Sequence, residues 1–238
     1  MAMSKKEFDV YFSLEEKKLN VSVFKKSEDN LVFFFEDNLG INSINEYTDF
    51  EELEKIIEKN IKKVEKNINE FVNNVFLMID TNETISIHIS LLKKLDNKII
   101  QKKDIQNLIR DAKQQIIRSY PTKDIVHIIV NKYIINDLDY VFVPTDINCN
   151  KISADIEFIC FPKNLIKKIE EVFNNFQISV DKVICSNYAK LFVNHNSSES
   201  ICKAGYNLNK GFNKQEIVIV PKKVEKKGFF EKLFYFFK

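Results

Sequence analysis

The chain is poor in glycine, with only Gly40, Gly205, Gly211 and Gly228 among 238 residues. Loops that cradle nucleotide phosphates usually need glycine, because backbone N–H groups must come close to the phosphate oxygens. The sequence contains no G-x-G-x-x-G or Walker-type loop, and it also lacks the G-x-S-x-G and H-E-x-x-H signatures. We therefore expect no enzyme, no catalytic residues, no nucleotide site and no cofactor.

Arginine is nearly as scarce, since Arg110 and Arg118 are the two arginines among 36 basic residues. The formal net charge is only +2, and arginine is the usual reader of phosphate and guanine, so nucleic-acid binding is not expected. The four cysteines and three histidines show no metal-ligand spacing, which predicts free thiols and no metal site. His88 and His127 have no acidic or cysteine partner within a motif, which is typical of surface or core histidines.

Apolar periodicity predicts an interleaved series of strands and helices. Strands are predicted at residues 8–14, 19–25, 30–36, 75–79, 84–91, 125–135, 151–161, 180–184 and 216–220. Helices are predicted at residues 49–70, 102–118, 164–176 and 186–192, the first of them capped by Thr48 or Asp49. Residues 194–214 fit neither pattern. The first three strands indicate a meander, and the whole order predicts an α+β or mixed α/β fold.

The last eleven residues form an amphipathic pattern that is too short to cross a bilayer. As a helix they would rise about 16 Å, against about 30 Å of hydrocarbon. Large apolar side chains would share one face: Phe229, Phe230, Leu233, Phe234 and Phe237. The flanking positive charge comes from lysines that include Lys222, Lys223, Lys226, Lys227 and Lys232. This pattern favours an anchor at an anionic membrane interface, and the alternative is a last helix packed on the protein's own core.

Several stretches, taken in order, resemble one bacterial family. Residues 100–109 resemble the start of a helix in an inserted subdomain, and Val126–Tyr133 resembles that subdomain's long strand. Residues 179–184, followed by Ala189, resemble the return to an actin-like core. Together with the amphipathic tail, these stretches are similar to FtsA, the actin-like division protein that ties FtsZ filaments to the inner membrane.

The resemblance implies an α+β fold: a remnant of one actin-like lobe with the FtsA inserted subdomain, followed by a linker and an amphipathic helix. The boundaries that we expect divide the chain into five parts. These are a partial actin-like lobe at 1–79, the inserted subdomain at 80–162, a return to the lobe at 163–220, a basic linker at 221–227 and the membrane-binding helix at 228–238.

The family's phosphate-binding motifs are degenerate in this chain. Where the family's first phosphate hairpin carries an acid, a glycine, a hydroxyl residue and a lysine, this sequence has Ser13, Glu15, Glu16 and Lys18. Only Lys18 fits, and two carboxylates in this place would repel a phosphate. The second, glycine-rich phosphate loop is missing, and so is most of the second lobe. By resemblance that lobe carries half the ATP site and the FtsZ-tail site, which puts direct FtsZ binding in doubt.

The expected function is therefore a non-enzymatic scaffold of the division machinery, peripheral on the cytoplasmic face of the bacterial inner membrane. Its expected partners are anionic lipids, other division proteins and further copies of itself, with no small-molecule substrate and no nucleic acid. The alternative within the same lineage is a cytoplasmic platform protein of a pilus or secretion machine. Two other classes stay open with less support: an ATPase or kinase with an unorthodox phosphate site, and a lysine-rich protein that touches nucleic acid.

Overall fold

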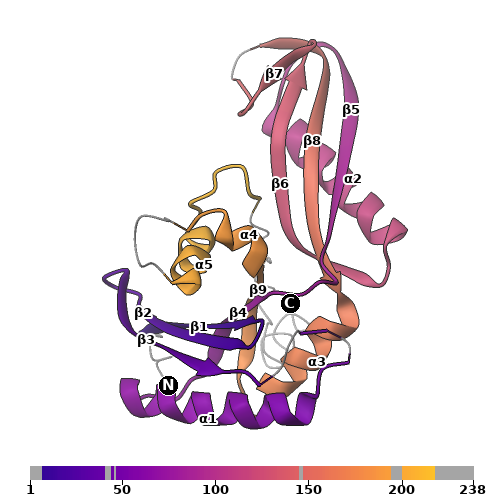
Figure 1. The fold of residues 1–238 in the computed structure, drawn as a ribbon. Helices are drawn as coiled ribbons and strands as arrows, with labels where there is room; N and C mark the ends of the chain where they lie inside the picture. Colours follow the sequence, from indigo (N-terminus) through magenta and orange to yellow (C-terminus); the bar gives the residue numbers. More distant parts are fainter. Residues whose placement is uncertain (1–6, 41–43, 46, 145–146, 194–199, 218–238) are drawn as a thin grey trace, which may run out of the picture.

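The computed structural model describes residues 7–40, 44–45, 47–144, 147–193 and 200–217. Two β-sheets dominate it: helices cover both faces of the larger sheet, and one helix lies along the smaller sheet (Figure 1). The strands of the larger sheet come from residues 8–79 and 179–185. The strands of the smaller sheet come from residues 85–162, which lie between these two segments in the sequence.

The five-stranded sheet begins with the predicted meander. Its strands are β1 (Phe8–Glu15), β2 (Lys18–Lys25), β3 (Asn30–Asn38), β4 (Asn74–Ile79) and β9 (Ser179–Cys185). The first three pair antiparallel, whereas β4 pairs parallel with β1 and β9 pairs parallel with β4, which gives the order β3-β2-β1-β4-β9. Every residue of β4 is buried, as expected for a central parallel strand.

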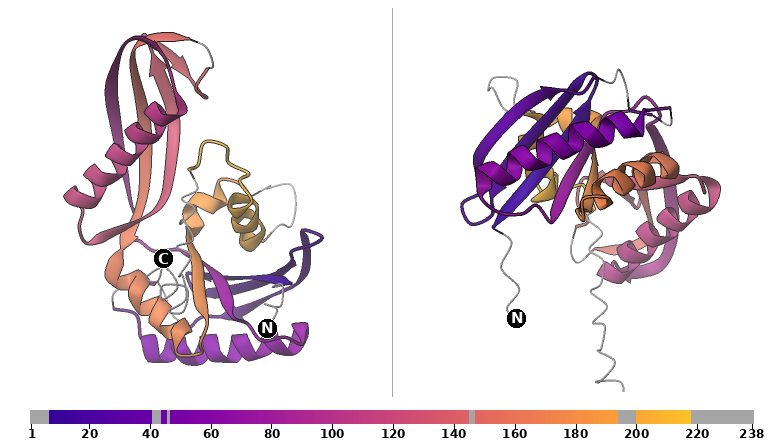
Figure 2. Two further views of the ribbon diagram at one scale, coloured as in Figure 1. Left: turned by 180° about the vertical axis from the view of Figure 1, so that it is seen from behind. Right: turned by 90° about the horizontal axis from the view of Figure 1, so that it is seen from below.

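Helices cover both faces of this sheet (Figures 1 and 2). They are α1 (Phe50–Ile68) and α3 (Lys163–Asn174) on one face, and α4 (Ser186–Lys190) and α5 (Ile201–Asn209) on the other. Two neighbouring residues of β1 show the division, because successive side chains of a strand point to opposite faces. Phe12 packs edge-on against Phe173 of α3, while Tyr11 meets Tyr206 of α5.

The ends of α1 carry the capping groups that a helix needs. The Asp49 side chain accepts hydrogen bonds from the backbone N–H groups of Glu51 and Glu52, so the predicted cap at Asp49 is confirmed. Asn69 ends the helix in the left-handed conformation, with φ of 56°. The buried stripe between these ends faces the sheet: Leu53, Ile57, Ile61 and Val64.

The four-stranded sheet stands on the end of the larger one, with one helix along its outer face (Figure 1). Its elements are β5 (Ile85–Ile99), α2 (Lys102–Ser119), β6 (Lys123–Ile135), β7 (Leu138–Tyr140) and β8 (Asn148–Pro162). The strand order is β5-β8-β6-β7, all antiparallel. The buried face of α2, formed by Leu108, Ala112 and Ile116, packs on the sheet residues that include Ile128 and Phe158.

Three elements differ from the sequence predictions, and a fourth predicted element is described only in part. β5 continues to Ile99, beyond the predicted end at residue 91, because its pairing with β8 extends past the regular alternation. β7 was not predicted, since three residues are too short a signal. Residues 201–209, which fitted neither pattern, form α5 with Ser200 as its N-cap. The predicted strand at 216–220 is described only through Ile217, and Glu216 forms an isolated antiparallel bridge with Ile129.

Candidate functional site

The degenerate phosphate hairpin lies at the β1–β2 turn. Ser13 and Glu15 belong to β1, and the backbone of Glu15 lies opposite that of Lys18 in the β1–β2 strand pair. Ser13 is fully buried and its hydroxyl donates to Glu15 over 3.3 Å, while Glu16 and Lys18 are exposed. The Lys18 ammonium forms one ion pair with a described residue, Glu36 at 3.5 Å, and both side chains are more than half exposed. The structure thus gathers two of the four predicted residues and leaves the other two at the surface.

Lys190 neutralises the acid at the centre of this hairpin. Its Nζ lies 3.3 Å from Oε2 of Glu15 and 2.8 Å from Oδ2 of Asp80. Asn187 donates to the other oxygen of Asp80 over 2.7 Å, and Asn20 donates to Oε1 of Glu15 over 2.9 Å. Burial alone would favour the neutral amine of Lys190, but the two carboxylates outweigh it and raise the pKa.

This network does not have the character of an anion site. A phosphate pocket offers unpaired N–H donors and positive charge, whereas here two carboxylates share one ammonium group. Sequence reasoning missed Asp80 and Lys190. Asp80 carried a weak signal, because it directly follows a buried strand, but Lys190 lies 110 residues further along the chain and carried none.

A second polar cluster joins the two sheets at His127. His127 was predicted as an ordinary surface or core histidine, and the structure places it in the core with a side chain that is 0% exposed. Its Nε2 accepts the backbone N–H of Cys185 over 2.9 Å, so its Nδ1 carries the proton and donates to Glu216 over 2.8 Å. Lys182 lies 3.6 Å from the same carboxylate, and the Tyr188 hydroxyl lies 3.3 Å from its second oxygen.

The protonation of this cluster follows from its surroundings. Burial lowers the pKa of His127 more strongly than Glu216 raises it, so the imidazole is neutral. Burial would raise the pKa of Glu216, but His127, Lys182 and Tyr188 together lower it. Both ring nitrogens of the neutral imidazole are engaged in hydrogen bonds, which tie β6 to β9 and to the segment that carries Glu216. No motif could reveal the pair, since its members are 89 residues apart.

The segment that carries Glu216 adds to the edge of β6. Gln215 accepts the backbone N–H of Val130, and Ile217 donates its own to Ile128. The Gln215 side chain donates further hydrogen bonds to the carbonyls of Val130 and Asn131. We call residues 213–217 the strap, because it ties the end of the described chain to the smaller sheet.

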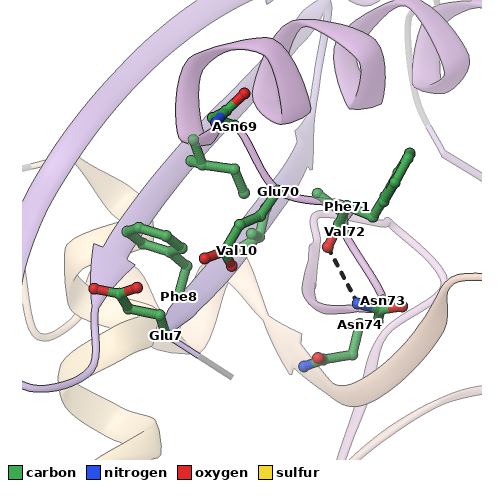
Figure 3. Close-up of a pocket in the computed structure, with 10 residues that line it drawn as sticks. Glu7, Phe8, Val10, Asn69, Glu70, Phe71, Val72, Asn73 and Asn74 are labelled. Carbon is green, nitrogen blue, oxygen red and sulfur yellow. Dashed lines mark hydrogen bonds between the residues drawn. The ribbon is translucent and has the colours of Figure 1, made fainter. Parts of the chain in front are cut away.

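A further hollow of about 460 Å³ lies between the start of β1 and the segment that joins α1 to β4 (Figure 3). Glu7, Phe8, Asn69 and Glu70 line it, while Phe71 is 83% exposed and points away from Phe8. Within the part of the chain that the structure describes, no group of three His, Cys, Asp or Glu side chains could hold a metal.

The predicted membrane-binding residues lie outside the described residues. They are Lys222, Lys223, Lys226, Lys227, Phe229, Phe230, Lys232, Leu233, Phe234 and Phe237. Among the described ranges, no helix has the length and apolar character needed to cross a membrane.

Comparisons with known proteins gave a family match for the smaller sheet and structural matches that cover most of the chain. The profile of the SHS2 domain inserted in FtsA matches residues 82–160, which include β5, α2, β6, β7 and nearly all of β8. No curated protein matches the chain by sequence. Among solved structures, a PilM–PilN type IV pilus biogenesis complex matches with a TM-score of 0.50 at 8% identity. That match covers 80% of this chain and 50% of the other, so this chain spans about half its length.

Two weaker structural likenesses accompany it. The cytoplasmic domain of EpsL, an inner-membrane component of the Vibrio cholerae type II secretion system, matches with a TM-score of 0.36, 10% identity, and coverage of 76% of this chain and 58% of that chain. A Bacteroides thetaiotaomicron protein with an actin-like ATPase fold gives a TM-score of 0.34, 11% identity, and coverage of 79% and 56%. The chain has a mixed α+β fold that resembles a partial actin-like lobe with an SHS2 domain, as predicted.

Proposed function

We propose that this protein is a non-enzymatic, membrane-tethered scaffold of the bacterial division machinery. The observation that carries the proposal is the SHS2 match at residues 82–160, because the matching profile describes the domain inserted in FtsA. The amphipathic pattern of residues 228–238, preceded by a basic stretch, supports the membrane tether.

The hairpin network supports a role without ATP. Glu15 and Asp80 already share Lys190, so an incoming triphosphate would add negative charge beside two carboxylates. Displacing Lys190 toward the phosphate would leave both acids without their cation. A scaffold needs no such pocket, and its contacts can come from the SHS2-like sheet and from lipid.

Membrane binding would be reversible, and its strength would depend on both parts of the tail. Each lysine near an anionic surface contributes roughly 1 kcal/mol, and buried phenylalanines add an apolar contribution. A single short helix binds marginally, so copies held together by a shared assembly would bind more tightly through avidity. We propose that contacts with other division proteins or further copies of this chain supply that assembly.

Flotation with anionic vesicles tests the tether. The full chain should float with vesicles that contain phosphatidylglycerol and stay behind with purely zwitterionic ones. Phe234→Glu should abolish flotation, because burying a carboxylate among acyl chains is prohibitive. The matched control is Tyr235→Glu, which adds the same charge to the polar face of the same helix and should weaken flotation only slightly. Equal flotation of both variants would refute the tail assignment.

A second candidate is an FtsA-like platform protein of a pilus or secretion machine. The likeness to the PilM–PilN complex favours it, since that complex serves type IV pilus biogenesis. Depletion in the native bacterium separates the two proposals. Filamentous cells that fail to divide would support the division scaffold, and normal division with lost piliation or secretion would support the platform.

A further inference from the structure

A groove lies at the junction between the two sheets, and the start of β6 and the strand β9 both line it. It encloses about 510 Å³, within the range of about 300–1,000 Å³ typical of ligand sites. β9 is the outer strand of its sheet, and β6 pairs with β7 only at residues 133–135. The first residues of β6, 123–127, precede the residues whose backbone the strap contacts. Their free edge therefore faces the groove instead of another described strand of the same sheet. Helix α3 closes one side with Ile166 and Glu170.

Apolar and acidic side chains together line the groove. Its apolar lining includes Ile125, Val126, Ile166, Val180 and Val183. Among the described residues that line it, the carboxylates are Asp124, Glu170, Asp181 and Glu216, and the one cation is Lys182. Lys182 already pairs with Glu216 inside the His127 cluster.

Of the other three acids that line the groove, Asp124 alone forms an ion pair with a described residue. Asp124 has only a 3.8 Å contact with Lys163, and Asp181 is hydrogen-bonded by the Asn74 amide. Glu170 forms no ion pair in the described part of the chain, and burial together with the neighbouring Asp124 raises its pKa. An occupant that fits would be an extended, apolar segment that brings positive charge.

The strap leads directly to this groove. Gln215 and Ile217 bond to Val130 and Ile128 in antiparallel register, so the chain runs toward the start of β6. Glu216 and Ile217 themselves line the groove. The sequence continues as Val-Ile-Val-Pro-Lys-Lys at 218–223, with three apolar residues for the lining and two lysines for the acids. Valine and isoleucine are also residues that strands prefer.

We propose that residues 218–223 dock in this groove of their own chain and extend the strand that the strap begins on β6. The apolar triplet then covers the lining, and Lys222 and Lys223 lie against Asp124 and Glu170. Docking fixes the point at which the basic linker and the tail leave the body, at the junction of the two sheets. This inference does not depend on lipid binding, so each can fail without the other.

Hydrogen exchange of the full chain, followed by mass spectrometry without lipid, tests the docking. The amides of residues 218–220 should exchange at least tenfold more slowly than those of an unfolded peptide with the same sequence. Exchange at the unfolded rate would overturn the proposal. So would protection that rises with protein concentration, because the groove would then hold a segment of a second copy.

Charge reversal tests the acids. Asp124→Lys combined with Glu170→Lys should remove most of the protection at 218–220, while the matched control Asp111→Lys, on the exposed side of α2, should not. Adding Lys222→Glu and Lys223→Glu to the double variant should restore the protection. Unchanged protection of β6 peptides in every variant checks that the sheet is intact. Protection at 218–220 that is indifferent to all these changes would refute the charge pairing.

Discussion

Replacing His127 by leucine should destabilise the protein far more than any exposed histidine would. His127→Leu keeps an apolar side chain in place but removes both hydrogen bonds, the one from Cys185 and the one to Glu216. Each buried polar group left without its partner costs about 1–3 kcal/mol, and a charged one costs more. The substitution leaves the Cys185 N–H without its acceptor, whereas Lys182 and Tyr188 still contact Glu216, so the total loss should be about 3 kcal/mol.

The same substitution should change how stability depends on pH. Burial lowers the pKa of His127, so its contribution is complete above the unfolded value of about 6.5 and is lost as the pH falls below it. The slope from this group cannot exceed about 1.4 kcal/mol per pH unit. Glu216, whose pKa is also lowered, acts in the same direction but only below about pH 4.5. His127→Leu should therefore flatten the fall in stability between pH 6.5 and 5.

Urea unfolding followed by far-ultraviolet circular dichroism at pH 7.5 and 5.5 measures both effects. The control is His88→Leu, because His88 is 64% exposed and lies 3.9 Å from Glu157. That variant should stay within about 0.5 kcal/mol of the parent. Equal losses in the two variants, or an unchanged pH dependence in His127→Leu, would refute the assignment of the cluster.

Three further predictions concern the larger sheet and its hairpin network. Gly205→Ala should lower the thermal midpoint by a few degrees, because the new Cβ would lie 2.5 Å from the sulfur of Met78, whose side chain is fully buried and has little room to move. Overpacking of about 1–3 kcal/mol is offset in part by the gain of about 1 kcal/mol from replacing a helical glycine; a raised midpoint would contradict the close approach. Lys190→Met should cost about 1 kcal/mol in urea unfolding, because this lysine is partly exposed. Calorimetric titration should detect no ATP binding to the parent or to Lys190→Met, and micromolar binding by either would contradict a scaffold without ATP.

Local periodicity accounts for the part of the fold that was predictable. The meander, the capped helix α1 and the strands β6 and β8 were recognised from short patterns that survive in the structure. Their apolar spacing is set by one strand or one helix face, so no distant residue is needed to read it.

The remaining features depend on distant partners. Helix α5 has a glycine in its middle, which disfavours a helix by about 1 kcal/mol, yet Gly205 is needed where the helix meets Met78. Tyr206 of the same helix stacks on Phe24, and that contact cannot be read from nine residues. The hairpin network and the His127 cluster join residues that are far apart in sequence. Sequence reasoning found Ser13 and Glu15 through the family resemblance, but it had no signal for Lys190.

The most direct test of the proposed function is the cellular position of the N-terminally tagged protein, with and without residues 228–238. The scaffold proposal predicts a band at mid-cell that depends on the tail. A diffuse signal that is the same with and without the tail would contradict it.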